Sequence, residues 1–398
     1  PYVDYLTHLL RYDNRLAGEA AGFMTPESSM LLHGKVPFVQ ADIRTHRLPP
    51  EAPDAVYGRL NNLKEGIAVI QRDFSNALLN GVGYEFGYYG HGWIAGDKRM
   101  MRTVGRCRDI EKFAREKGTK RIDTENSIAV IVDDIATYYS SQASPIHNLS
   151  LKYQMPEFSH TGVGIDTYLL EDLPLMPQYK CYVFLNTYHL TPEQQEFIQK
   201  NLKRDGKVLA FMYAQGVATN DGIMPSKVQE VTGIKTDVLE KTVKQEIRYV
   251  KTDEPAGKYL PVGKTFGNRN RVGPLFVPRE GTVLATLTNG DTPALVLKKF
   301  ADHTVCYSSI IGLSSEIVKG LAEISGITVI NQNKMDCTYV SDNMFAVHTG
   351  NGGHRTFHVP PKYTQKATEL FTGREFKIQD GAFEYVLEPT STSLFFME

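Results

Sequence analysis

Hydrophobic and polar residues along positions 1–118 alternate between two spacings, one typical of helices and one typical of strands. Helical spacing of apolar residues predicts an amphipathic helix at the start of the chain and two further helices, over Tyr2–Ala21, Ala55–Leu79 and Gly105–Lys117. Two short apolar runs between them predict strands, over Lys35–Asp42 and Gly81–Tyr89. Such alternation implies parallel strands joined by right-handed crossovers.

A polar linker, Thr119–Asn126, leads into a second region with longer apolar runs. Buried strands are predicted over Ser127–Asp133, Tyr179–Leu185, Lys207–Met212, Ala294–Lys298 and His303–Ser308. Helices are predicted over Thr191–Asp205, where Thr191 caps and Pro192 opens the first turn, and over Ser315–Ser325. This order predicts an α/β, doubly wound domain over 127–330.

Beyond about Val329 the pattern changes to short alternating runs separated by turns, such as Met344–His348, Arg355–Val359 and Phe383–Leu387. Alternation of this kind predicts a small antiparallel β domain over 331–398.

A closed (β/α)₈ (TIM) barrel needs about 250 residues. Residues 1–118 are therefore expected to be at most the last third of such a barrel.

The composition of the chain argues against several classes of partner and site. The 398 residues carry 44 Lys and Arg against 45 Asp and Glu, and no basic block or membrane-length apolar run occurs. These features argue against nucleic-acid and membrane partners. Cys107, Cys181, Cys306 and Cys337 lack metal-ligand spacing, so no metal is expected. No glycine-rich phosphate loop follows the first strand of the middle domain, and no cofactor is expected. The abrupt start at Pro1 leads us to expect further residues upstream, and nothing indicates a compartment.

Several stretches resemble the glycoside hydrolases related to family 42 β-galactosidases. YKCYVFLNTYHLTPEQQEFIQKNLKRDGKVLAFMYAQG (179–216) and TPALVLKKFADHTVCYSS (292–309) resemble their flavodoxin-like trimerisation domain, which is similar in fold to class I glutamine amidotransferases. DNMFAVHTGNGGHRTFHVP and LEPTSTSLFF resemble their terminal β domain. SSMLLHGKVPFVQADIRTH (28–46) resembles their seventh barrel strand and GVGYEFGYYGHGW (81–93), more loosely, their eighth.

The resemblance implies a retaining, exo-acting β-glycosidase that hydrolyses terminal β-linked sugars from an oligosaccharide or β-glycoside. It also implies a homo-oligomer, a trimer, or a companion chain that completes the barrel. The alternative is a catalytically silent carbohydrate-binding or oligomerisation protein derived from such an enzyme. A glutaminase is disfavoured, because the turn after the third strand of the middle domain, Tyr213–Gly216, contains no Cys nucleophile.

Retaining β-glycosidases need two carboxyl groups, one acid/base and one nucleophile. The resemblance places the nucleophilic Glu at the end of the seventh strand, where this chain has Gln40. The acid/base would lie on a fourth strand that is absent from this chain. Three explanations for Gln40 stay open: a substitution introduced to trap a sugar complex, natural loss of the chemistry, or a nucleophile at a neighbouring position.

Five further residues near these strand ends are candidate substrate-binding groups: Asp42, Arg44, Glu85, Tyr88 and Trp93. Carboxylates and guanidinium groups bind sugar hydroxyls, and aromatic rings stack on the C–H face of a pyranose. The alternatives are a local Asp42–Arg44 ion pair, an ion pair at Glu85, and packing of the rings beneath a loop.

Overall fold

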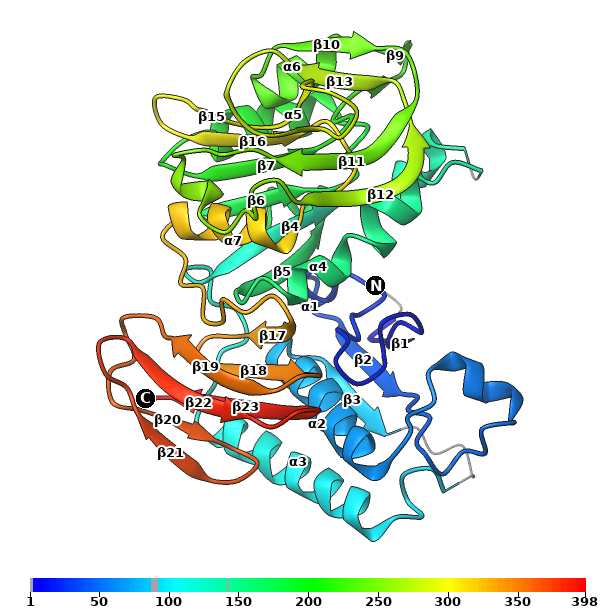
Figure 1. Cartoon of the computed structure of the whole chain (residues 1–398), viewed down its shortest axis with the longest axis vertical. Helices are drawn as coiled ribbons and strands as arrows, with labels where there is room; N and C mark the ends of the chain where they lie inside the picture. The colour runs from blue at the N-terminus through cyan, green and yellow to red at the C-terminus, as the bar shows by residue number, and fades with distance from the viewer. Residues whose placement is uncertain (1–2, 87–91, 142) are drawn as a thin grey trace. The chain divides into compact units, whose positions relative to one another are not determined.

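The computed structural model describes residues 3–86, 92–141 and 143–398 (Figure 1). The described chain divides into two compact units. Unit 1 draws on residues 1–127, 159–165 and 328–398, and unit 2 on residues 128–158 and 166–327. Unit 1 is thus assembled mainly from the two ends of the sequence, with unit 2 inserted between them.

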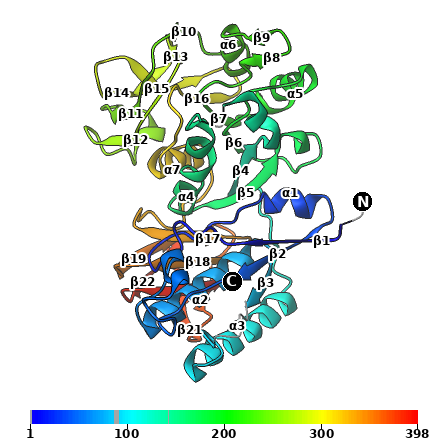
Figure 2. The same ribbon diagram turned by 90° about the vertical axis from the view of Figure 1, so that its right-hand side faces the viewer.

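Three parallel strands open unit 1: β1 (Tyr5–Leu9), β2 (Val36–Ala41) and β3 (Gly83–Phe86). They pair in the order β1-β2-β3, with β2 in the centre. Figure 2 shows this small sheet near the short helix α1 (Glu27–Leu32). β2 and β3 lie within the strands expected from the sequence. β1 lies inside the predicted opening helix, so that prediction was wrong.

The segment 3–21 is not helical because its backbone forms a strand and then a looped segment. Residues 5–9 pair with β2, and the following chain reverses through left-handed conformations at Asn14, Gly18 and Ala21, with φ of 63°, 89° and 45°. A right-handed helix cannot pass through such residues. The apolar side chains that suggested a helical stripe serve a strand and a looped segment instead.

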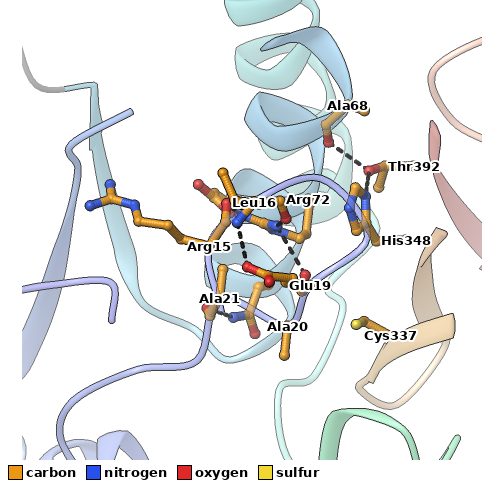
Figure 3. A network of polar contacts seen from close by, with 12 residues as sticks. Arg15, Leu16, Glu19, Ala20, Ala21, Ala68, Arg72, Cys337, His348 and Thr392 are labelled. Atoms are coloured by element: carbon orange, nitrogen blue, oxygen red, sulfur yellow. Dashed lines mark hydrogen bonds and ion pairs between the residues drawn. The ribbon is translucent and has the colours of Figure 1, made fainter. Parts of the chain in front are cut away.

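Arg72, on helix α2 (Leu63–Leu79), holds this looped segment in place (Figure 3). Its guanidinium is fully buried, donates to the backbone carbonyls of Arg15, Leu16 and Glu19, and pairs with Asp73 at 2.8 Å. A buried charge is tolerated when its donors are all engaged in this way. The Arg72 guanidinium therefore holds the looped segment through three of its backbone carbonyls.

Two long helices cover the sheet and join it to the end of the chain. α2 begins at an Asn62 cap, eight residues later than predicted, since Pro53–Tyr57 forms a separate 3-10 turn. α3 spans Lys98–Glu116, seven residues longer at its start than predicted. Both helices pack in a core that includes buried side chains of β17, β18 and β23, strands from the last sixty residues.

The C-terminal strands of unit 1 pair antiparallel, as their alternation predicts. A five-stranded sheet has the order β17-β18-β23-β20-β21, and β19 and β22 form a separate pair. Their bounds are β17 Asp336–Val340, β18 Met344–Thr349, β19 Gly353–His358, β20 Lys366–Glu369, β21 Arg374–Lys377, β22 Ala382–Leu387 and β23 Ser391–Met397. Phe345, Phe357, Phe383 and Phe395 pack ring against ring between them.

Unit 2 is built on a nine-stranded sheet in the order β12-β11-β14-β15-β16-β7-β6-β4-β5. β16, β7, β6 and β4 pair parallel, whereas β12, β11, β14 and β15 pair antiparallel. The strands are β4 Ser127–Val132, β5 Gly164–Leu169, β6 Cys181–Phe184, β7 Val208–Met212, β11 Val243–Tyr249, β12 Thr265–Val272, β14 Thr282–Leu287, β15 Pro293–Lys299 and β16 Thr304–Ser308.

The remaining elements of unit 2 are short, apart from α7. Two small strand pairs occur, β8 (Ala218–Thr219) with β9 (Gly222–Ile223), and β10 (Thr236–Leu239) with β13 (Leu275–Pro278). The helices are α4 Met155–Ser159, α5 Pro192–Phe197, α6 Ser226–Thr232 and α7 Ser315–Ile324. At α5, Thr191 caps the helix as expected, and the Gln194 side chain accepts in return from the Thr191 amide. The sequence pattern missed β5, β11, β12 and β14, and it did not show that β15 pairs antiparallel with its neighbours.

Candidate functional site

The candidate site lies at the carboxyl edge of the three-stranded sheet in unit 1. Parallel strands all end on one edge, so the residues that follow β1, β2 and β3 meet there. Gln40 is next to last in β2, with Leu9 of β1 and Glu85 of β3 as its register partners. Since register partners in a sheet share a face, Gln40 and Glu85 lie side by side on one face.

That face is the more open one. Val39 and Ala41 alternate with Gln40 and are fully buried, Val39 in a core with Ala77 and Val82 and Ala41 in the core of α2 and α3. Gln40 is half-buried and Glu85 is exposed. The helices therefore cover one face of the sheet and leave the face of Gln40 and Glu85 accessible within unit 1.

Immediately after β2, Asp42 is the centre of a buried polar cluster. Its carboxylate accepts from the Tyr12 hydroxyl at 2.9 Å and from Arg44 Nη1 at 2.5 Å, and its backbone carbonyl accepts from Arg15. Asp42, Arg15 and Arg44 are all buried. Arg15 Nη1 also lies 3.9 Å from the Asp42 carboxylate, so two guanidinium groups share it, and the charges of Asp73 and Asp54 act on Arg15 and Arg44 as well.

Aromatic rings surround Arg44. Its guanidinium carbon lies 5.5 Å from the ring centroid of Tyr12, 5.3 Å from that of Tyr57 and 5.9 Å from that of Trp93. Burial and the neighbouring Asp42 carboxylate raise the pKa of Tyr12, so its hydroxyl stays protonated and donates. The Trp93 backbone carbonyl accepts from the Thr45 hydroxyl at 2.6 Å, which fixes the chain after β3 against the chain after β2.

Among the residues that the structure describes, three buried nitrogens in this region have no hydrogen-bond partner: Arg15 Nη1, Arg44 Nε and His46 Nδ1. A buried N–H donor without an acceptor costs about 1–3 kcal/mol, so such groups usually have a water or a ligand as partner. Hydroxyl and ring oxygens of a sugar are suitable acceptors. Among the described residues no group of three or more His, Cys, Asp or Glu side chains has the geometry of a metal site.

The structure brings together most of the residues that the sequence singled out. Asp42 and Arg44 form the ion pair considered as an alternative to sugar binding, Trp93 lies beside Arg44, and Glu85 lies beside Gln40. Tyr88 lies outside the described residues. Sequence reasoning missed Tyr12, Arg15 and Tyr57. Tyr12 and Arg15 could have been found, because a Tyr and an Arg just after an apolar strand are candidate site residues. They were missed because residues 5–9 were predicted to be helical.

An apolar groove of about 680 Å³ follows the free edge of β3, between that strand and α3. Phe38, Tyr84, Phe86 and Val104 are among its lining residues. Parallel sheets are normally covered on both faces and paired along their strands, and an open apolar edge favours association with another strand. Among the described residues, the groove therefore follows a strand edge that no other strand pairs with.

The cysteines are not candidate nucleophiles. All four are buried, and burial raises the pKa of Cys107, Cys181 and Cys337 to about 12, which leaves the thiolate unpopulated near neutral pH. The turn after β7 has Tyr213 in a left-handed conformation, with φ of 64° and its hydroxyl bound to the Pro274 carbonyl. That position, where an amidotransferase would carry its cysteine, is filled by a packed aromatic ring.

No protein-family model and no curated protein matches this sequence. Solved structures do match. The cold-adapted β-galactosidase from Rahnella sp. R3 is 14% identical with a TM-score of 0.60, over 99% of this chain and 60% of that one. A catalytic mutant of Gan42B, a GH42 β-galactosidase from G. stearothermophilus, is 13% identical with a TM-score of 0.51, over 93% and 49%.

A third match, the β-galactosidase from Bacillus circulans sp. alkalophilus, is 18% identical with a TM-score of 0.50, over 76% of this chain and 45% of that one. At these identities the likeness is one of fold. The chain has a mixed α/β fold related to that of GH42 β-galactosidases, and it spans 45 to 60% of the length of these structures. No described helix has the length and apolar character needed to cross a membrane.

Proposed function

We propose that this chain carries part of the active site of a retaining, exo-acting β-glycosidase that acts on terminal β-linked sugars. The observation that supports it most is the placement of Gln40 and Glu85 on the accessible face at the carboxyl edge of a parallel sheet. In barrel enzymes the catalytic groups come from that edge. The fold likeness to β-galactosidases supports the same class of substrate.

In this proposal Gln40 occupies the nucleophile position, where a Glu is expected. Arg15 and Arg44 supply donors for sugar hydroxyls, with Asp42 holding both guanidinium groups in place. Trp93 lines the sugar site from the loop after β3. Tyr88 is proposed as a second aromatic contact, and it lies outside the described residues.

The architecture that follows is also proposed. Residues 1–118 would be the last strands of a TIM barrel, 127–330 a flavodoxin-like trimerisation domain and 331–398 a terminal β domain. The order β5-β4-β6-β7-β16 corresponds to the 2-1-3-4-5 order of flavodoxin-like sheets, which supports the second assignment. The open edge of β3 supports a barrel completed by further residues or by a companion chain.

A second candidate function rests on Gln40 itself. A carboxamide carries no charge and cannot form the glycosyl-enzyme ester of a retaining mechanism. The chain would then belong to a silent protein that binds carbohydrate or mediates assembly. Both candidates share the fold and the sugar-facing surface, and they differ in whether a carboxylate at position 40 produces turnover.

The test is hydrolysis of aryl β-galactosides, β-glucosides and β-mannosides by the full-length natural protein and by its Gln40→Glu variant. We expect the variant to gain about 100-fold or more over the parent, the usual contribution of a positioned catalytic carboxyl group. Gln379→Glu, an exposed change of the same type on the C-terminal β region, is the matched control and should gain nothing. Absence of activity in both parent and Gln40→Glu would contradict the glycosidase proposal.

A further inference from the structure

A cationic ribbon runs along one edge of the unit 2 sheet. It consists of β11 and its antiparallel partner β12, which is the edge strand, together with their flanking turns. In Figure 1 the two strands lie next to each other. Residues 240–272 contain eight Lys and Arg against four Asp and Glu, although the whole chain carries a net charge of −1. Positive charge is therefore concentrated here.

The ribbon has one buried and one solvent-facing side. On β11 the side chains of Gln245, Ile247 and Tyr249 point inward, where Gln245 accepts from the Ile311 amide and Tyr249 donates to Ser314. Lys244 and Arg248 alternate with them and are exposed. Because Lys244 and Arg248 are four residues apart on the same strand, their side chains are separated by roughly 13 Å.

On β12 the exposed residues continue this charged side. Arg271 is the register partner of Lys244, so two cations lie directly opposite each other, which destabilises a strand pair. Arg269 lies in the adjoining bulge, between Asn268 and Asn270. In the described chain, Lys244, Arg248 and Arg269 lie within ion-pair distance of no carboxylate. Glu246, on the same side, accepts from Thr288 instead.

Protection of a sheet edge against aggregation does not account for this arrangement. Charges that protect an edge belong on the edge strand, here β12. Arg248 is on the part of β11 that pairs with both β12 and β14, so it does not lie on a free edge. Lys244 lies opposite a second cation, Arg271, and two such charges are stabilised when an anionic partner lies across them.

We propose that the β11–β12 ribbon is a docking surface for an acidic polysaccharide, a glycan with repeating carboxylate or sulfate groups. Guanidinium groups bind such anions in bidentate fashion, and the amides of Asn268 and Asn270 suit the intervening hydroxyl groups. The choice of a glycan among polyanions rests on the proposed carbohydrate-directed function. The ribbon belongs wholly to unit 2, whereas the candidate catalytic residues belong to unit 1.

The test is binding of the full chain to polygalacturonate, with dextran as the neutral polymer and poly-L-glutamate and duplex DNA as the other polyanions. We expect binding to polygalacturonate alone, weaker at about 200 mM than at about 50 mM salt. The double variant Lys244→Gln/Arg248→Gln should weaken it about tenfold and reduce the dependence on salt, and Arg269→Gln should weaken it about threefold.

Lys64→Gln/Lys377→Gln removes two exposed cations from unit 1 and is the matched control, expected to stay within about twofold of the parent. If the Lys244→Gln/Arg248→Gln variant bound polygalacturonate as tightly as the parent does, the proposed docking surface would be wrong. DNA or polyglutamate binding as tightly as polygalacturonate would overturn the glycan assignment. Neither readout depends on glycosidase activity, so this proposal and the catalytic one can fail separately.

Discussion

Single residues in unit 1 show how burial decides protonation. His348 on β18 is fully buried, and its Nε2 accepts from the Gly18 amide at 2.7 Å. The ring proton must then be on Nδ1, which donates to Thr392, whose hydroxyl donates to the Ala68 carbonyl (Figure 3). Burial, assisted by the nearby Arg72 charge, lowers the pKa of His348 well below its usual value.

A pH dependence of stability follows from His348. Because its pKa is lower in the folded than in the unfolded state, the unfolded chain takes up the proton first as the pH falls below about 6.5. The free energy of unfolding should then decrease, by at most about 1.4 kcal/mol per pH unit from this residue. Urea unfolding of the parent and of His348→Gln between about pH 7.5 and about pH 5, a range that contains the unfolded-state pKa of about 6.5, measures the difference.

The variant should show a shallower loss of stability on acidification. His354→Gln is the control, because His354 is largely exposed and should keep the slope of the parent. Equal slopes in parent and His348→Gln would show that the buried imidazole does not stay neutral in the folded protein.

At the scale of secondary structure elements, the packing between the paired strands β2 and β3 depends on a glycine. Gly83 is the register partner of Phe38, whose ring lies across it where a Cβ atom would be. A side chain at 83 must displace this ring from the open face of the sheet. At Gly105, within α3, a Cβ atom would meet no described atom within 4 Å outside the neighbouring residues and backbone of its own helix.

The two glycines predict opposite effects of the same substitution. Gly83→Ala should lower the free energy of unfolding by about 1–3 kcal/mol through overpacking, whereas Gly105→Ala should raise it by about 0.5–1 kcal/mol through helix propensity. Denaturant unfolding of the two variants beside the parent measures both. A neutral result for Gly83→Ala would mean that Phe38 relaxes without cost.

At the scale of the whole molecule, unit 1 depends on both ends of the chain. β23, residues 391–397, is the strand between β18 and β20, and it packs against α2 from the first third of the sequence. Unit 2 has its own nine-stranded sheet, and β23 is not one of its strands. The two units therefore have separate requirements for folding.

A truncation after Leu387 tests this dependence. Loss of β23 should abolish cooperative unfolding of unit 1, while unit 2 keeps its protection from hydrogen exchange in β6, β7 and β16. Removal of Glu398 alone is the control and should leave both units folded. Protection of α2 in the truncated chain at the level of the parent would show that residues 1–127 fold without the C-terminal strands.

The sequence by itself determined the strongly periodic parts of this protein. The strands β2, β4, β6, β7, β15 and β16, the cap of α5 and the change to antiparallel pairing near residue 330 all follow from local patterns of apolar and turn residues. Gln40 and its neighbours at the end of β2 were found in the same way, because a strand and the residues after it are contiguous in the chain.

Only the tertiary structure decided the rest, because those features depend on residues far apart in the sequence. Residues 5–9 became a strand through pairing with β2, although their own pattern favours a helix. Tyr12, Arg15 and Tyr57 joined Asp42 and Arg44 only through folding of the intervening loops. The antiparallel half of the unit 2 sheet, with its cationic side, likewise required pairing between β11 and distant strands, which no local pattern encodes.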